Sequence, residues 1–237
     1  MHPIAIFQFS PNVEPGYFAS FLEARNQPFT LFRIDEGTPV PTAPTGFSGI
    51  CLMGGVMSVN DPLPWIPQIL ELIRQAVAAD IPVIGHCLGG QLLSRALGGV
   101  VSRNSVAEIG WGELSVTDSA VQLGWLDSTE GFPAFHWHHD TFSLPEKAVP
   151  LMSSAHCQNQ AFALGPHLGM QCHVEMTEAL IRTWNEVWAE ETASAETLPP
   201  SVQPSTRQLA ELGENLPHMR AMAHRLYEHW LENVRKA

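Results

Sequence analysis

The chain contains 237 residues, 45% of them hydrophobic, and its 12 Lys and Arg against 24 Asp and Glu leave a formal net charge of −12. This length is sufficient for one large α/β domain, or for a domain with an appendage. The negative charge repels phosphate backbones and anionic membranes, so we expect neither nucleic acid nor a membrane surface as a direct partner.

The N-terminal segment MHPIAIFQFS has no basic region and no long apolar core. No window of the sequence reaches the roughly 20 apolar residues of a membrane span, so we expect a cytoplasmic protein. The four cysteines, Cys51, Cys87, Cys157 and Cys172, show no C-x-x-C spacing. A disulfide framework is therefore not expected, and an isolated cysteine is most often a small buried hydrophobic residue unless its surroundings indicate otherwise.

Short apolar runs alternate with longer amphipathic stretches in the first part of the chain. The pattern predicts strands over 4–9, 30–34, 47–53 and 81–85, and helices over 16–26, 63–80 and 89–97. Strands separated by helices predict a doubly wound α/β fold, with a mostly parallel sheet covered on both faces.

The second part of the chain changes to short extended segments divided by Pro, Gly and Asp. Candidate strands lie at 106–116, 135–137, 149–153, 160–164 and 168–173, and we expect them to be antiparallel strands added to the sheet or packed beside it. A helix is predicted over 176–190, followed by a Pro/Ser/Thr-rich connector and one or two amphipathic helices. We therefore divide the chain into a main domain over 1–190, a connector over 191–206 and a helical C-terminal appendage over 207–237.

The segment PVIGHCLGGQLLSRALGG, residues 82–99, places Cys87 between a predicted strand and a predicted helix. Glycines at 85, 89 and 90 permit the strained angles and close approach of a nucleophile elbow at the carboxyl edge of the sheet. Open α/β sheets bind ligands at that edge, and the N-terminus of the following helix favours a thiolate. We therefore predict that Cys87 is a nucleophile.

A nucleophilic thiol needs a base, and the base needs a group that orients it. The segment GMQCHVEMT, residues 169–177, supplies His173 and Glu175 two positions apart on a predicted strand. Side chains at i and i+2 share a strand face, so the imidazole and the carboxylate can lie side by side. The alternative is a core histidine and a charge near a helix N-terminus; the elbow cysteine favours the catalytic interpretation.

Five motifs, which follow one another along the chain, resemble those of a known family. GHCLGGQ (85–91) resembles the G-x-C-x-G-x-Q nucleophile motif of class I glutamine amidotransferases, and CHVE (172–175) resembles their F-H-P-E. LMGGVMSVND (52–61) is similar to their G-G-P-x-S segment, while WHHDTFSLP (137–145) and NQAFALG (159–165) resemble motifs of the lone, GMP-synthase-like members. The resemblance runs from about 4 to 188 and implies a flavodoxin-like α/β fold with added antiparallel strands.

The resemblance also implies roles for individual residues. Cys87 would attack the side-chain amide of glutamine to form a γ-glutamyl thioester, and His173, oriented by Glu175, would transfer the protons. Backbone N–H groups of Leu88 and Gly55 would hold the oxyanion. Gly54 and Gln91 match positions that line the glutamine pocket, and no metal or other cofactor is implied.

Four positions depart from the family pattern. His86 and Gly90 replace the usual apolar residue before the cysteine and the His or Met before the glutamine, and the second change alters a position near the substrate. Val174 replaces the proline of H-P-E, and His139 occupies the glycine position of W-H-G-D. None of these changes removes a catalytic group.

The chain that follows residue 188 is too short, and too poor in Gly-rich phosphate motifs, to be a synthetase domain. GMP synthesis by this chain alone is therefore excluded. Either a separate subunit accepts the ammonia, or the chain hydrolyses another γ-glutamyl compound, such as a γ-glutamyl amine or peptide. Both routes use the same thioester, so the motifs do not distinguish between them. The sequence is also compatible with a homo-oligomer.

Two other classes are weaker alternatives. An α/β-hydrolase with a cysteine nucleophile would place its acid on a separate loop, and an inactive regulatory module of the same fold would not need an intact Cys, His and Glu. The residues His136, His138, His139 and Asp140 suggest a metal site at first sight. Because no second cluster follows at ligand spacing, we expect no metal and interpret the segment as a structural loop near the active-site mouth.

Overall fold

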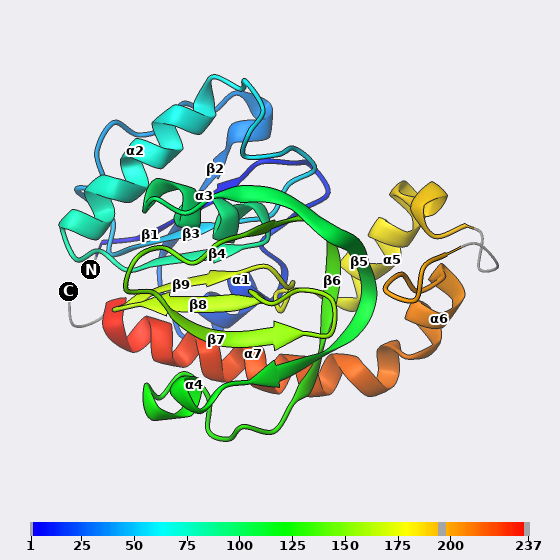
Figure 1. The fold of residues 1–237 in the computed structure, drawn as a ribbon. Helices are drawn as coiled ribbons and strands as arrows, with labels where there is room; N and C mark the ends of the chain where they lie inside the picture. The colour runs from blue at the N-terminus through cyan, green and yellow to red at the C-terminus, as the bar shows by residue number, and fades with distance from the viewer. Residues whose placement is uncertain (1, 194–197, 235–237) are drawn as a thin grey trace.

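The computed structural model describes residues 2–193 and 198–234 (Figure 1). Within them, nine strands form one sheet in the order β2-β1-β3-β4-β9-β8-β7-β5-β6. The predicted α/β fold, with a mostly parallel part and added antiparallel strands, is confirmed. Figure 1 shows helices on both sides of the sheet.

The parallel part of the sheet comes from the first four described strands and from the last one. It consists of β1 (Ile4–Gln8), β2 (Phe29–Arg33), β3 (Gly49–Leu52), β4 (Val83–His86) and β9 (His167–Met170). Every residue of β1 is buried. Ile4 and Ile6 face one core cluster while Ala5 and Phe7 face the other, as expected for a strand covered on both faces.

Two pairs of helices cover the parallel strands. On one face, α1 (Gly16–Ala24) and α7 (Leu212–Val234) contribute to the first core cluster; on the other, α2 (Trp65–Ala78) and α3 (Leu88–Ala96) contribute to the second. The predicted helix over 63–80 corresponds to α2, whose buried residues recur at helical spacing.

The antiparallel part belongs to the same sheet and is more extensive than the sequence predicts. Its strands are β5 (Val101–Val116), β6 (Phe132–Phe142), β7 (Val149–Ser154) and β8 (Ala161–Leu164), with β8 joined to β9. The pairing of β5 with β6 shifts register between Arg103 and Glu108. The segment around His136 is therefore strand, and its interpretation as a structural loop is wrong.

One predicted strand is too long. The segment 168–173 was expected to be extended throughout, but β9 ends at Met170. Beyond it the chain leaves β4 and crosses toward β6, where the backbone N–H of His173 donates to the carbonyl oxygen of Phe135 over 2.8 Å in an isolated bridge. His173 and Glu175 therefore lie on an irregular segment rather than on a strand.

The remaining helices follow the sheet in the chain. They are the short α4 (Asp118–Gln122), α5 (Glu178–Val187), α6 (Ser205–Ala210), and two single turns, Ile34–Glu36 and Ala189–Glu191. Part of the predicted connector, 194–197, lies outside the described residues, as do 235–237 of the predicted appendage. Within the connector, Val202 forms an isolated parallel bridge with Ile109 of β5.

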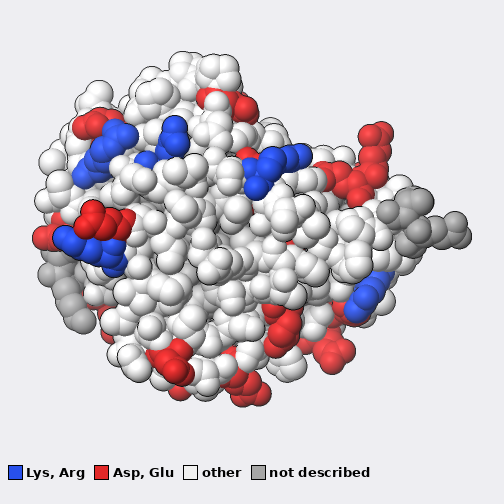
Figure 2. All heavy atoms as spheres, viewed as in Figure 1, with Lys and Arg blue, Asp and Glu red and all other residues white. Residues whose placement is uncertain are grey.

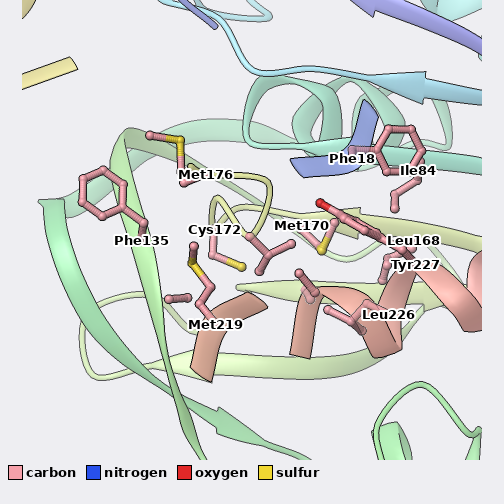
Figure 3. Packing of buried hydrophobic residues seen from close by; sticks show 14 of the residues in the cluster. Phe18, Ile84, Phe135, Leu168, Met170, Cys172, Met176, Met219, Leu226 and Tyr227 are labelled. Atoms are coloured by element: carbon pink, nitrogen blue, oxygen red, sulfur yellow. The ribbon is translucent and has the colours of Figure 1, made fainter. Parts of the chain in front are cut away.

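The long C-terminal helix packs against the main core. Met219, Leu226 and Tyr227 are fully buried, and Figure 3 shows them in the same layer as Leu168 and Met170 of β9. The helix thus buries an apolar stripe against the sheet. The division of the chain into three parts stays a prediction.

The surface agrees with an acidic protein. Figure 2 shows Lys and Arg only as separated groups on the face it presents, with no continuous basic area among the described residues there. Among the described helices, none has the length and apolar character needed to cross a membrane.

Candidate active site

Cys87 lies in a one-residue turn between β4, which ends at His86, and α3, which begins at Leu88. Its backbone angles, φ 49° and ψ −107°, are in a region that non-glycine residues rarely adopt. Two hydrogen bonds hold this turn: the Cys87 N–H donates to the Met170 carbonyl over 2.8 Å, and the Gln91 N–H donates to the Cys87 carbonyl over 2.9 Å. The surrounding structure thus imposes the strained conformation that the glycine pattern predicts.

The neighbouring glycines are needed for close backbone approach. A Cβ at Gly89 would overlap the carbonyl oxygen of Leu52, and one at Gly90 would overlap that of Met170. The first turn of α3 therefore sits directly against β3 and β9. Its N-terminal N–H groups, which have no partner inside a helix, open at the carboxyl edge of the sheet beside the thiol.

His173 and Glu175 form a buried pair although they do not share a strand. The Nδ1–H of His173 donates to Oε1 of Glu175 over 2.6 Å, with side-chain exposures of 2% and 1%. Burial by itself would lower the pKa of His173, but the Glu175 carboxylate and the Cys87 thiol outweigh it and raise that pKa. Burial would raise the pKa of Glu175, and the charge of His173 outweighs it and lowers that pKa. The turn after β9 thus brings together the side chains that strand periodicity was expected to align.

Cys87 and His173 face the same cavity, which has a volume of about 370 Å³. They flank Gly54: a Cβ built there would lie 3.0 Å from Cε1 of His173 and 3.6 Å from Cβ of Cys87. Gly55 also lines the cavity, and a Cβ there would press on Cδ2 of Leu88 at 2.7 Å. The turn at 54–55 and the start of α3 are therefore adjacent, as the predicted oxyanion site requires.

Gln91 lines the cavity, and a second glutamine that the motifs do not include connects it to the thiol. Its Nε2 donates to Oε1 of Gln171 over 3.1 Å, and Nε2 of Gln171 donates to Sγ of Cys87 over 3.4 Å. Gln171 is fully buried directly after β9. Its position two residues before His173 was the available signal, because residues at i and i+2 of the predicted strand share a face.

The cavity has one aromatic side and one polar side. Trp137, Trp184 and Trp188 form the aromatic side, and the ring of Trp184 stands edge-on to His173 with centroids 4.8 Å apart. On the polar side, Asp140 accepts a hydrogen bond from Ser58 Oγ over 2.9 Å and pairs with Arg103 at 3.5 Å. The space above the thiol is thus bounded by ring faces and by charged groups that already have partners.

His139 and Glu191 close another part of the cavity. Nε2 of His139 lies 2.7 Å from Oε2 of Glu191, and the Trp137 indole N–H donates to Oε1 over 3.2 Å. The hydrogen bond from His139 lowers the pKa of Glu191, which keeps this carboxylate ionised. Histidine at the glycine position of the W-H-G-D motif therefore adds a polar contact to the cavity wall.

A second group of side chains with metal-ligand chemistry lies farther along the antiparallel strands. Glu108, His136 and His138 are all buried, and one ligand atom from each lies within 4.8 Å of the others. Glu108 is the partner that sequence spacing did not reveal.

Comparisons with known proteins agree with this geometry. The model of the family "Glutamine amidotransferase class-I" matches residues 19–182. The glutamine amidotransferase-like protein YfeJ of Salmonella typhimurium is 30% identical over 189 residues, covering 76% of this chain and 79% of YfeJ. Gamma-glutamyl peptidase 2 of Arabidopsis thaliana is 25% identical over 191 residues, covering 75% of this chain and 77% of the peptidase.

A solved structure extends the likeness to nearly the whole chain. The crystal structure of a glutamine amidotransferase from Methylobacillus flagellatus superimposes with a TM-score of 0.94 at 41% identity, covering 98% of this chain and 95% of that one. The family match spans well over half of the chain, and the fold, including the antiparallel strands and the C-terminal helices, is shared. The chain therefore belongs to the class I glutamine amidotransferase family.

Proposed function

We propose that this protein hydrolyses the side-chain amide of glutamine through a covalent thioester on Cys87 and releases ammonia. The observation that carries the proposal is the meeting of Cys87, held in a strained turn at a helix N-terminus, with the buried His173–Glu175 pair on one cavity. A nucleophile, a base and a group that orients the base are the minimum set for acyl transfer.

The reaction begins with transfer of the thiol proton to His173 and attack of Sγ on the amide carbon. The negative charge on the amide oxygen is stabilised by the N–H groups of Leu88 and Gly55. His173 then protonates the leaving nitrogen, and ammonia departs from the γ-glutamyl thioester. The raised pKa of His173 supports this step, because the imidazolium is the proton donor.

In the hydrolysis of the thioester, His173 acts first as a base and no longer as an acid. His173 removes a proton from water, the hydroxide attacks the thioester carbon, and the thiol leaves with glutamate as the product. Glu175 keeps the proton of His173 on Nδ1 and stabilises the imidazolium each time it forms. Gly54, which is not among the residues that line the cavity, allows Cys87 and His173 to lie close together because it has no side chain. Gln91 lines the cavity and acts through Gln171 to orient the thiol.

A second candidate is hydrolysis of a γ-glutamyl amine or peptide. A cavity of about 370 Å³ falls within the range of about 300–1,000 Å³ for small-molecule pockets, so it can accept a leaving group larger than ammonia. The likeness to a gamma-glutamyl peptidase over 75% of this chain points the same way. Under the first candidate a separate subunit accepts the ammonia; under the second no such partner is required.

Glutamate release from glutamine and from a panel of γ-glutamyl amines and peptides distinguishes the two, with Cys87→Ser as the control. Turnover of glutamine alone supports the amidotransferase and directs the search to an ammonia acceptor. Selective turnover of a conjugate supports the free-standing hydrolase.

No turnover of any substrate, together with no protection of Cys87 by glutamine against a thiol-specific inactivator, would overturn both candidates. That outcome would leave an inactive regulatory module of the same fold. Undiminished activity of Cys87→Ser would remove the cysteine from the mechanism.

A further inference from the structure

Three buried side chains with ligand chemistry converge on one face of the β5–β6 pair. Glu108 lies directly opposite His138, and His136 lies two positions along the same strand, on the same face. Their exposures are 4%, 3% and 1%, and one ligand atom of each lies within 4.8 Å of the others. A Cβ at position 112 would stand 2.9 Å from the His136 ring, so glycine there leaves the ring its space.

Neither ring nitrogen of His136 has a side-chain hydrogen-bond partner among the residues that the structure describes, and the neighbouring backbone of Gly112 does not meet hydrogen-bond geometry with the ring. An imidazole always presents at least one donor, and when neutral it also presents an acceptor. Buried polar groups in folded proteins are almost always partnered, and those that are not call for an explanation. The bare nitrogens of His136 lie beside a carboxylate and a second imidazole, which are groups that bind a cation.

The contact between His138 and Glu108 needs a positive charge. Nδ1 of His138 is 3.0 Å from the carbonyl oxygen of Asp140, which can only accept, so Nδ1 carries a proton. In the neutral ring, Nε2 then presents a lone pair to Oε2 of Glu108, 3.0 Å away. Gln160 Nε2 lies 3.5 Å from this nitrogen but already donates to Glu108 over 2.7 Å, so a second proton or a metal ion between His138 and Glu108 would remove the remaining repulsion. A proton would leave His136 unpartnered, whereas a metal ion would use all three side chains.

From this geometry we propose that Glu108, His136 and His138 bind one divalent transition-metal ion, with Zn²⁺ as the best-suited ion. Two imidazoles and one carboxylate form a recognised three-ligand set that leaves a further position open. In a tetrahedral site with bonds of about 2.0–2.1 Å, neighbouring ligand atoms are about 3.3 Å apart. The separation of 3.0 Å between His138 and Glu108 is close to this value, and because the three ligand atoms lie within 4.8 Å of one another, His136 would move toward the other two on binding.

The surroundings orient the ligands as a metal site requires. Ser154 Oγ donates to Oε1 of Glu108 over 2.6 Å, and Gln160 Nε2 donates to Oε2 over 2.7 Å. The contact of His138 with a backbone carbonyl is the usual way in which a metal-binding histidine is held in one tautomer. A second cavity of about 210 Å³ adjoins Glu108 and His136 and provides both an entry route and room for a water ligand.

The ion would fix the wall of the first cavity. His138 lines that cavity together with His139 and Asp140, its neighbours on β6. A metal ion shared between β5 and β6 would hold this strand in place where its register with β5 has just shifted. The proposal concerns structure and does not depend on the reaction proposed above.

The test measures Zn²⁺ binding by isothermal titration calorimetry to the full chain after treatment with a chelator. The Cys87→Ser background removes the active-site thiol as a competing ligand. We expect one high-affinity ion per chain, a raised melting temperature in its presence, and the visible spectrum of a protein-bound ion when Co²⁺ replaces Zn²⁺.

His136→Phe keeps a ring and removes both nitrogens, and it should weaken binding at least 100-fold. His156→Ala, at a residue that lines the same cavity but lies outside the ligand group, should bind as tightly as the parent. Glu108→Gln provides a second ligand variant should His136→Phe fail to fold, and the same loss is expected. Absence of binding in the Cys87→Ser parent, or equal affinity in the ligand variants, would overturn the proposal.

Discussion

Replacing Glu175 by glutamine tests whether a buried charge, and not only a hydrogen bond, supports His173. The glutamine side chain can still accept from Nδ1 of His173, so the tautomer is retained and only the negative charge is lost. The two groups lie 2.6 Å apart and are almost fully buried. With about 4 Å between the charge centres and an effective dielectric constant of about 20, the lost attraction is about 4 kcal/mol.

This energy stabilises the imidazolium that the proposed mechanism forms before each proton donation. Since about 1.4 kcal/mol corresponds to a factor of ten in rate, Glu175→Gln should lower kcat by about 10³-fold at neutral pH. Glutamate release at saturating substrate measures the effect, and thermal unfolding verifies that the variant is folded. Glu178→Gln, at an exposed carboxylate that pairs with Arg182, is the matched control and should retain full activity. A folded Glu175→Gln enzyme with kcat within about threefold of the parent would refute the reasoning.

Three further predictions concern stability and can be measured by urea unfolding. Cys87→Gly should be more stable than Cys87→Ala by about 1 kcal/mol, because glycine adopts a φ of 49° without strain; equal stabilities would contradict this. Tyr227→Phe should lower the free energy of unfolding by about 1–3 kcal/mol, because it removes the hydroxyl that lies 2.9 Å from the buried Nε2 of His86. An unchanged unfolding midpoint would show that this hydrogen bond does not contribute to stability. Burial lowers the pKa of His167 to about 4, so its neutral form stabilises the fold above about pH 6.5 and this contribution is lost between 6.5 and 4. In His167→Gln the amide oxygen can still accept from the Val83 N–H, but the side chain does not titrate. The free energy of unfolding should therefore fall less steeply between pH 6.5 and 4, by up to about 1.4 kcal/mol per pH unit. The same pH dependence in the variant and the parent would show that His167 is not the group responsible.

The sequence predicts the catalytic candidates better than it predicts the backbone that carries them. Cys87 lies in the turn that its flanking glycines indicate. Only glycine lets two backbone segments come this close, as Gly89 and Leu52 do, so the residue type itself indicates the contact. His173 and Glu175 do meet, but the strand that was expected to align them ends at Met170. Period-2 alternation holds only while a chain stays in the sheet, and after Met170 the backbone hydrogen bond from His173 to Phe135 directs the chain away from it.

The histidine-rich segment shows the reverse case. His136 and His138 are two positions apart and share a face because the segment is a strand and not the expected loop, and spacing within the sequence gives no indication of Glu108. Glu108 is brought to His138 by antiparallel pairing and by the register shift that precedes it. The proposed ligand set is assembled across two strands and has no fixed spacing in the sequence, whereas the expectation of no metal was based on spacing alone.

By itself, the sequence determined what depends on short-range backbone physics: the alternation of strands and helices, the turn at Cys87, and the motifs that indicate acyl-transfer chemistry. Only the tertiary structure decided which distant side chains complete the site. Gln171 reaches Cys87 across 84 positions of the chain, and Tyr227 reaches His86 across 141. Such contacts follow from how the sheet and the C-terminal helix pack in three dimensions, and no periodicity along the chain encodes them.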